Sequence, residues 1–258
     1  GAGQSNSRTR RPSRIRRLTQ ARVSSWPFGP PLRDESTVSL RLSDWMFFRV
    51  IIPARWGSTR FPGKVLADLN GRSVLARVYD VGLASGAATV TVATDDDRVA
   101  EHARAHGFDV AMTSIHHVSG TDRVAEVVAR RGFPPDAVVV NLQGDMPAFD
   151  PTALAAVLEP LIDPDVAIAT LVSPIADDAE LSNPHVVKAL VDFGEGGKIG
   201  DNAVGTAVDF ARDPELLAAG AHYHHIGVYA YRRSALAQFV GLPQSAREKE
   251  FGLEQLRA

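Results

Sequence analysis

From residue 47 onward, short runs of β-branched and apolar residues alternate with amphipathic stretches of helical length. Runs of this kind are typical of strands buried on both faces, and the stretches between them repeat apolar residues at helical spacing. Such alternation predicts parallel strands joined by crossover helices. We therefore predict an α/β fold, a three-layer α/β/α sandwich with a mostly parallel sheet.

The expected elements follow one another in a regular order. Strands are expected at 47–54, 89–96, 108–114 and 136–145. Helices are expected at 74–86, 97–107, 121–132 and 150–162. Residues 166–174 continue the core, 183–193 are extended, and 224–233 form a strand with strictly alternating apolar positions. Residues 194–221 are glycine-rich and weakly patterned, so they are left unassigned.

The first 45 residues differ in composition from the rest. Residues 1–33 carry eight arginines and no acidic residue. With little apolar surface to bury, residues 1–45 are expected to be a disordered, Arg-rich extension of a domain spanning 46–258. Met46 stands directly before the first strand, which favours an upstream extension of the reading frame or a cloning remnant. A nucleic-acid-binding arm and an organelle presequence are the alternatives.

Composition excludes several kinds of site. The chain has no cysteine, which excludes disulfides, thiolate metal ligands and cysteine nucleophiles. No apolar run approaches the roughly 18 to 20 residues of a membrane-spanning helix, so a membrane partner is not expected. Nucleic-acid binding through the Arg-rich segment would depend steeply on salt, and it is kept only as an alternative.

A basic loop, PARWGSTRFPGK, follows the first expected strand. It supplies two glycines for close backbone approach, two hydroxyls and three cations: Gly57, Gly63, Ser58, Thr59, Arg55, Arg60 and Lys64. Guanidinium forks and backbone amides match phosphate oxygens, so the loop predicts a polyphosphate site, with a solvated basic turn as the plain alternative. It matches neither the Walker pattern nor G-x-G-x-x-G, which disfavours the usual ATPase and dinucleotide interpretations.

Two further loops are expected at the same edge of the sheet. NLQGDMP places Asp145 just after an apolar run, where a carboxylate can hold Mg²⁺ against phosphates. HHVSGTDR places Ser119 and Thr121 before a helix whose first turn holds Arg123. An ordinary turn and an ordinary helix cap are the alternatives for these two loops. Because ligands bind at the carboxyl ends of parallel strands, the three loops are interpreted together.

Seven segments, taken in order, resemble the cytidylyltransferases that activate 3-deoxy-manno-octulosonate (KDO), the acidic sugar of the lipopolysaccharide inner core. They are VIIPARWGSTRFPGK, VATDDD, HHVSGTDRVAEV, VVNLQGDMP, NPHVVK, HHIGVYAYRR and LEQLRA, and the resemblance spans residues 48–258. It implies a nucleotide-diphospho-sugar transferase fold of the GT-A or Rossmann-like type. It also implies transfer of a cytidylyl group from CTP to KDO, giving CMP-KDO and pyrophosphate. Family members are typically cytoplasmic homodimers, and both properties are carried over as expectations.

The same resemblance assigns roles to particular residues. Lys64, Arg60 and Asp145 are the implied catalytic residues, with Asp145 as the ligand of a Mg²⁺ cofactor. The implied CTP-binding residues are Arg55, Ser58, Arg60, Lys64, Thr94, Asp95, Ser119, Thr121 and Arg123. The implied sugar-acid residues are Gln143, Arg212, His225, Tyr229, Glu254 and Gln255, for which packing or solvent-facing roles are the alternatives.

The chain departs from the family pattern at three places. Met146 stands where relatives carry an acid, and Asp209 stands where they carry an aromatic residue, next to Arg212 for which it would compete. The chain ends at LEQLRA, whereas relatives continue with a segment whose Asp is thought to complete the metal site. We therefore expect a less fixed metal site, an exposed sheet edge and low or absent activity. A transferase for another acidic sugar and a non-catalytic nucleotide-binding remnant are the alternatives.

Overall fold

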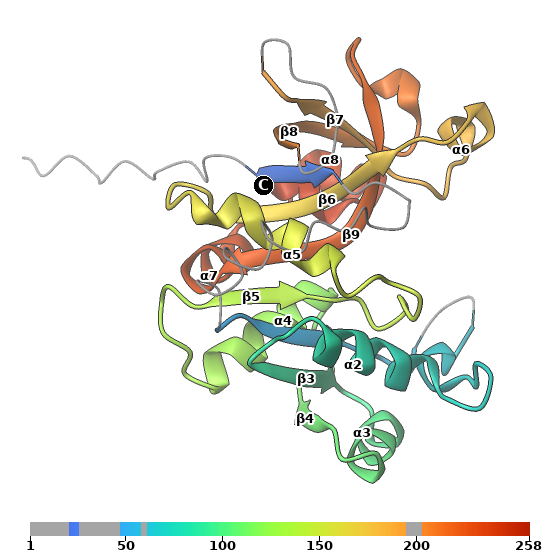
Figure 1. Cartoon of the computed structure of the whole chain (residues 1–258), viewed down its shortest axis with the longest axis vertical. Coiled ribbons are helices and arrows are strands. Elements are labelled where there is room, and N and C mark those ends of the chain that lie inside the picture. The colour runs from blue at the N-terminus through green and yellow to red at the C-terminus, as the bar shows by residue number, and fades with distance from the viewer. Residues whose placement is uncertain (1–20, 26–46, 58–60, 195–202) are drawn as a thin grey trace, which may run out of the picture.

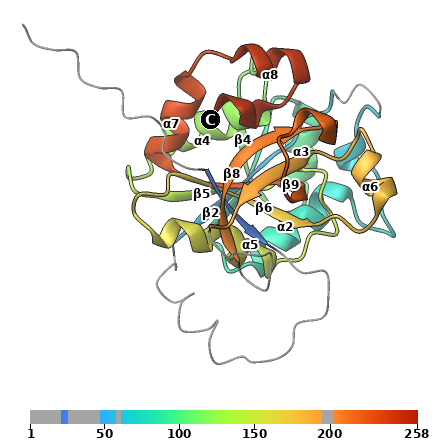
Figure 2. The same ribbon diagram turned by 90° about the horizontal axis from the view of Figure 1, so that it is seen from above.

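The computed structural model describes residues 47–57, 61–194 and 203–258, together with the backbone of residues 21–25. Within these residues the strands form one sheet in the order β4-β3-β2-β5-β9-β6-β1-β8-β7, with helices on both faces (Figures 1 and 2). This confirms the predicted α/β sandwich. No described helix combines the length and apolarity needed to cross a membrane.

The parallel half of the sheet matches the predicted crossover pattern. Its strands are β2 (Arg49–Pro53), β3 (Thr89–Thr94), β4 (Asp109–Met112) and β5 (Val138–Asn141), each parallel to its neighbour. The connections contain η2 (Lys64–Leu66), α2 (Val74–Ala84), α3 (Asp97–Ala105) and α4 (Gly120–Arg130). Each crossover returns the chain to the same edge, so the loops after the strands gather there.

The second half of the sheet is largely antiparallel, which the sequence pattern did not indicate. Its strands are β6 (Ile168–Pro174), β7 (Lys188–Asp192), β8 (Val204–Ala211) and β9 (His222–Arg232). Strand β9 runs antiparallel to β5, β6 and β7. The helices here are α5 (Ala153–Leu158), η3 (Glu159–Ile162), α6 (Asp178–Ser182), η4 (Pro214–Leu216), α7 (Arg233–Gly241), α8 (Ala246–Phe251) and η5 (Glu254–Arg257).

Two apolar layers hold the helices against the sheet. In β2, Val50 and Ile52 point to a core shared with α2, α3 and α5, whereas Ile51 points to a second core shared with α4 and α7. Successive residues of a strand face opposite sides, so a fully apolar run is what a sheet covered on both faces requires. Burying each such side chain stabilises the fold by roughly 1.5–3 kcal/mol relative to leaving it exposed.

Strand β1 (Ala21–Ser25) lies inside the sheet, parallel to β6 and antiparallel to β8 (Figure 1). These five residues belong to the segment predicted to be disordered, so that prediction does not hold for them. The remaining residues of 1–45 lie outside the described residues. The prediction and the structure differ here because β1 is ordered by pairing with strands far along the chain, and local composition does not reveal such pairing.

Candidate active site

The loops at the carboxyl ends of the parallel strands surround a cavity of about 440 Å³, here called the strand-end cavity. It is lined by Arg55, Trp56, Gly57, Asp95, Asp96, Ile115, His117 and Arg123. The structure therefore brings together Arg55, Asp95 and Arg123 of the predicted CTP-binding residues. Ser58 and Arg60, also predicted for this site, lie outside the described residues.

In the described part of the basic loop, Gly63 packs against the ring of Trp56. Gly63 has a φ of 73°, and a Cβ added to it would lie 2.7 Å from the Trp56 ring. The Gly63 N–H also donates to the Trp56 carbonyl at 2.9 Å. The Arg98 guanidinium lies over the Trp56 ring, 3.7 Å from its centroid, and is held by Asp96. A residue with a side chain at position 63 would have to push this ring out of place.

Lys64 and Asp145, both predicted to be catalytic, form an ion pair with each other, and neither is among the residues that line the strand-end cavity. The Lys64 Nζ lies 3.0 Å from Asp145 Oδ2, and their side chains are 45% and 52% exposed. Asp145 follows Gly144, where an added Cβ would lie 2.8 Å from the Pro53 carbonyl oxygen, so the β5 loop packs directly against the end of β2. An exposed ion pair contributes only about 0–1 kcal/mol, so both groups can exchange partners with a charged ligand at little cost.

The metal-binding capacity of this region is small. Within the described residues, no three His, Asp or Glu side chains are grouped closely enough to hold a metal ion. Beside Asp145, Met146 packs against the core. Magnesium is commonly held by one or two carboxylates, with phosphates and water completing its octahedron. Asp145 therefore fits a magnesium ion that also binds a phosphate ligand, but not one held by protein side chains alone.

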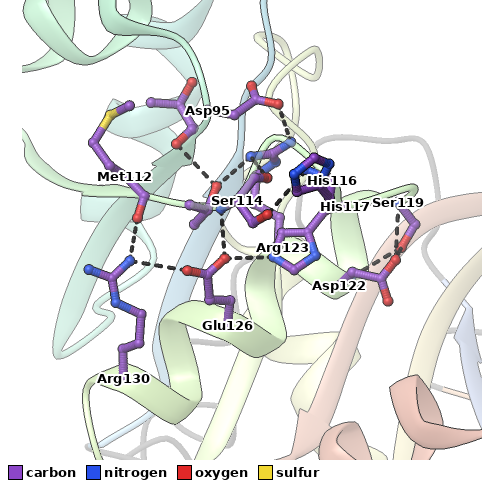
Figure 3. A network of polar contacts seen from close by, with 12 residues as sticks. Asp95, Met112, Ser114, His116, His117, Ser119, Asp122, Arg123, Glu126 and Arg130 are labelled. Atoms are coloured by element: carbon purple, nitrogen blue, oxygen red, sulfur yellow. Dashed lines mark hydrogen bonds and ion pairs between the residues drawn. The ribbon is translucent and has the colours of Figure 1, made fainter.

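The floor of the strand-end cavity is a fixed ion pair between Arg123 and Asp95. The Arg123 side chain is only 3% exposed and donates to Asp95 Oδ2 at 2.7 Å (Figure 3). It also donates to the Thr113 hydroxyl and the Ser114 carbonyl. Thr94, another predicted CTP-binding residue, is fully buried, and its hydroxyl accepts the Asp96 N–H. In this conformation Thr94 shapes the turn and does not line the cavity.

The loop on the other side of the cavity is tied down by Glu126 (Figure 3). Glu126 accepts the Ser114 N–H at 2.8 Å, the His117 ring lies 2.6 Å from it, and Arg130 donates to it at 3.1 Å. Burial raises the pKa of Glu126, but these three hydrogen bonds outweigh burial and lower it. The carboxylate therefore fixes His117 in the cavity wall.

Ser119 and Thr121 do not line the strand-end cavity. Ser119 is the N-cap of α4 and forms a capping box with Asp122. Its hydroxyl also lies 3.0 Å from Glu254 Oε1, and the Thr121 hydroxyl donates to Glu254 Oε2 at 2.8 Å. The two hydroxyls predicted to contact CTP are instead engaged by a carboxyl from η5.

A second cavity of about 460 Å³ lies among β6, β8, β9 and η5, and Glu254 is part of its lining. We call it the aromatic cavity. Besides Thr170, Phe210 and Tyr231, its lining includes every residue predicted to contact the sugar acid: Gln143, Arg212, His225, Tyr229, Glu254 and Gln255. These residues come from four distant parts of the chain, and the fold brings them to one place.

The buried groups of the aromatic cavity are mostly neutral. Burial lowers the pKa of His225 to about 3, so its imidazole is uncharged, and its Nε2 lies 3.0 Å from the Thr170 hydroxyl. Burial raises the pKa of Tyr229 and of Tyr231, so both remain phenols. Burial also raises the pKa of Glu254, despite the hydrogen bonds from Thr121 and Ser119. The His225 imidazole and the Tyr229 and Tyr231 phenols are thus uncharged, and the lining also carries the Glu254 carboxyl and the exposed Arg212 guanidinium.

Comparison with known proteins identifies the family. The family model described as "Cytidylyltransferase" matches residues 49–258. The 3-deoxy-manno-octulosonate cytidylyltransferase of Paramagnetospirillum magneticum is 44% identical over 212 residues, covering 81% of this chain and 83% of that protein. The enzyme of the same name from Halorhodospira halophila is 45% identical over 218 residues, covering 82% and 84%. The chain belongs to the 3-deoxy-manno-octulosonate cytidylyltransferase family.

A solved structure supports the assignment of this chain to the cytidylyltransferase family. It is titled as CMP:2-keto-3-deoxy-manno-octonic acid synthetase complexed with CTP and superimposes with a TM-score of 0.70 at 37% identity. The match covers 82% of this chain and 84% of that one.

One prediction about the cytidylyltransferase's aromatic cavity was wrong. Asp209 does not compete for Arg212; it pairs with Arg247 of α8 at 3.0 Å. Residues three apart along extended chain face opposite sides, so Asp209 points away from the side on which Arg212 lies. Lys188, buried between β8 and β9, donates to the Arg212 carbonyl at 2.7 Å and to the Asn183 carbonyl at 2.6 Å. This ammonium group therefore anchors the backbone that carries Arg212.

The sequence reasoning also missed the ion pair that supports η5. The Arg257 and Glu248 side chains are only 5% and 4% exposed, and Arg257 Nε donates to Glu248 Oε2 at 2.9 Å. Arg257 Nη2 also lies 3.7 Å from Glu254 Oε1. The pair fixes the turn that presents Glu254 and Gln255 to the aromatic cavity. In the sequence, both residues resemble ordinary solvent-facing charges of a short helix.

Proposed function

We propose that this cytidylyltransferase transfers a cytidylyl group from CTP to KDO, releasing pyrophosphate and forming CMP-KDO. The observation that supports this most strongly is that the residues predicted for the sugar acid all line one cavity, while Arg55, Asp95 and Arg123, predicted for CTP, line another. The strand-end cavity is lined by two arginines and two aspartates, and the aromatic cavity presents an uncharged imidazole and two phenols together with Glu254 and Arg212. The relative solved with CTP supports the nucleotide half of the proposal.

In this reaction the anomeric hydroxyl of the sugar acid attacks the α-phosphorus of CTP. A new oxygen–phosphorus bond forms, the bond to pyrophosphate breaks with its electron pair going to the pyrophosphate oxygen, and the hydroxyl proton passes to water. Such chemistry leaves the protein mainly with positioning and charge neutralisation. Lys64 would exchange Asp145 for a phosphate oxygen and stabilise charge at the α-phosphate as the bond breaks. Arg55 would contact the triphosphate from the wall of the strand-end cavity. Ser58 and Arg60 are proposed as triphosphate contacts on the basis of family membership.

Magnesium enters the proposal through Asp145. When bound, the ion would neutralise charge on the triphosphate, with Asp145 as its carboxylate ligand and with phosphate oxygens and water completing its shell. Freed from Lys64 by the incoming phosphates, Asp145 would be available for this role.

The aromatic cavity would hold the sugar acid. The side chains of Gln143, His225, Tyr229 and Gln255 offer donors and acceptors for sugar hydroxyls, and Arg212 offers a guanidinium for the carboxylate. A carboxylate ligand is favoured here by Arg212, because a guanidinium can form a bidentate, charge-assisted pair with it.

The proposal is tested by measuring pyrophosphate release from CTP and KDO, with Mg²⁺, for the parent protein and for Lys64→Ala. Loss of one transition-state contact lowers kcat by roughly 10²–10³-fold. The KM for CTP should change much less. Lys249→Ala is the matched control, because Lys249 is an exposed lysine of α8 away from both cavities. A change confined to KM would refute the role of Lys64, and CTP binding without pyrophosphate release by the parent would favour a non-catalytic remnant.

A transferase for another acidic sugar remains the alternative within this class. A panel of sugar acids, each tested with CTP, distinguishes the two by the ratio of kcat/KM values. Lipopolysaccharide biosynthesis, a cytoplasmic location and a homodimer belong to the proposal on the basis of family membership, and nucleic acid is not a proposed partner.

A further inference from the structure

Five strands of the described sheet close into a ring. Strand β9 pairs with β6, β6 with β1, β1 with β8, β8 with β7, and β7 returns to β9. The return is geometrically possible because β9 is long: its first residues pair with β7 and its last residues pair with β5. Among the described residues, β1 alone joins β6 to β8 (Figure 1).

The ring forms much of the wall of the aromatic cavity. Thr170 lies on β6, Phe210 on β8, and His225 and Tyr229 on β9, and Arg212 follows directly after β8. The spacing between β6 and β8 therefore sets the width of the cavity, and β1 fills that space.

The pairing of β1 is centred on the same part of the wall. Val23 lies opposite Thr170 of β6 on one side and opposite Gly205 of β8 on the other. Thr170 in turn contacts His225 through its hydroxyl. Without β1, the facing N–H and C=O groups of β6 and β8 would lose their partners along a strand that is buried from Ile168 to Ser173. A buried polar edge of this kind must either recruit water or move.

We propose that residues 21–25, upstream of the region that the family model matches, are an integral strand of the cytidylyltransferase domain. The gap between β6 and β8 accepts this segment of the chain's own N-terminus, and the segment holds the aromatic cavity at its working width. The consequence for sugar-acid binding rests on the proposed function, whereas the structural consequence does not.

The test uses the full chain and the variant Val23→Pro. A strand paired on both sides does not tolerate proline, because proline lacks the N–H of the ladder and restricts the backbone. Val23→Thr keeps a β-branched residue at the same position. Ser13→Pro introduces proline outside the strand. These two variants are the controls.

We expect Val23→Pro to speed amide hydrogen exchange at residues 168–172 and 204–206 by at least tenfold, with exchange in β2 and β3 unchanged. We also expect its KM for KDO to rise about tenfold and its KM for CTP to stay within twofold of the parent. Both controls should match the parent in all three measurements. A synthetic peptide of residues 18–28, added to Val23→Pro, should restore part of the lost protection.

Unchanged exchange in Val23→Pro would overturn the inference, as would equal changes in the Ser13→Pro control. Protection that rises with protein concentration in the parent would also overturn it, because the strand would then come from a second copy. If Val23→Pro changes exchange but the parent releases no pyrophosphate, the proposed function fails and the strand assignment stands. If exchange is unchanged and the parent is active, the inference fails alone.

Discussion

Removing one partner of the buried Glu248–Arg257 pair should destabilise the domain strongly. In Arg257→Ala the Glu248 carboxylate stays behind, 4% exposed and without its bidentate partner. Breaking a buried pair in this way costs about 3–5 kcal/mol. Loss of the guanidinium lying 4.9 Å from the Phe239 ring adds a smaller penalty of about 0.5–2 kcal/mol. For a domain of this size each kcal/mol lowers the melting temperature by about 2–4 °C, so we expect a fall on the order of 10 °C.

The same substitution should affect the aromatic cavity more than the strand-end cavity. Arg257 fixes the turn that presents Glu254 and Gln255, so its loss should raise the KM for the sugar acid while the KM for CTP changes little. Arg257→Lys keeps the charge but not the planar fork, and should give intermediate values for stability and KM.

Thermal and denaturant unfolding of Arg257→Ala, together with the double variant Glu248→Leu/Arg257→Met, provide the assay. The double variant should recover most of the lost stability, because it leaves no unpaired charge behind. The hydrogen bond from Arg257 lowers the pKa of Glu248, so its contribution is present above the ordinary carboxyl pKa and is lost as pH falls through the lowered value. The difference in melting temperature between the parent and Arg257→Ala should therefore become smaller at acid pH. A melting temperature of Arg257→Ala within about 2 °C of the parent, less than 1 kcal/mol, would refute this reasoning.

Further predictions concern the cavities directly. Burial lowers the pKa of His225 to about 3, so its ring should show no titration by NMR between pH 5 and 8. As pH falls, the imidazole binds a proton in the unfolded state before it does so in the folded state. The contribution of neutral His225 to stability is therefore present above its ordinary pKa of 6.5 and is lost as pH falls toward 3. Burial raises the pKa of Glu254, so the parent loses stability as pH rises from the ordinary carboxyl pKa of 4.5 through the raised pKa. Glu254→Gln lacks this titration, so its melting temperature relative to that of the parent should increase with pH. A difference in melting temperature that stays constant with pH would contradict this prediction. Gly63→Ala should raise the KM for CTP, because the added Cβ would displace Trp56. Gly71 is the control: it has a φ of 78° and no atom within 4 Å of an added Cβ, so Gly71→Ala should lower stability without changing the KM for CTP. Equal KM values for the two variants would show that the Trp56 contact is unimportant for CTP binding.

The parallel half of the fold could be predicted from the sequence because its strands are rich in buried β-branched residues, such as the three valines at 138–140. Strand β8 could not, because its buried positions are irregular and its pairing with β7 shifts register between Leu190 and Val191. Strand β1 is a short segment in an arginine-rich region. Only its partners, which lie far along the chain, make it a strand.

The residues of the candidate site also fall into a group that the sequence indicated and a group that it did not. The sugar-acid residues, such as Gln143 and Arg212, were assigned through family resemblance, and the fold gathers them around one cavity. Ser119 and Thr121 line neither cavity, and the sequence does not indicate their contact with Glu254, because that residue comes from the last helical turn of the chain. No local pattern marks such a contact, whereas the Ser119 cap itself could be read from its spacing to Asp122.

The position of β1 has a consequence for how the protein folds as it is made. Residues 21–25 are translated long before residues 168–172 and 204–206, their neighbours in the sheet. On the ribosome this segment must therefore remain without its partners until almost the whole domain has been translated. Non-local pairing of this kind is slow because a long loop must close first, so insertion of the N-terminal strand should be among the last steps of folding.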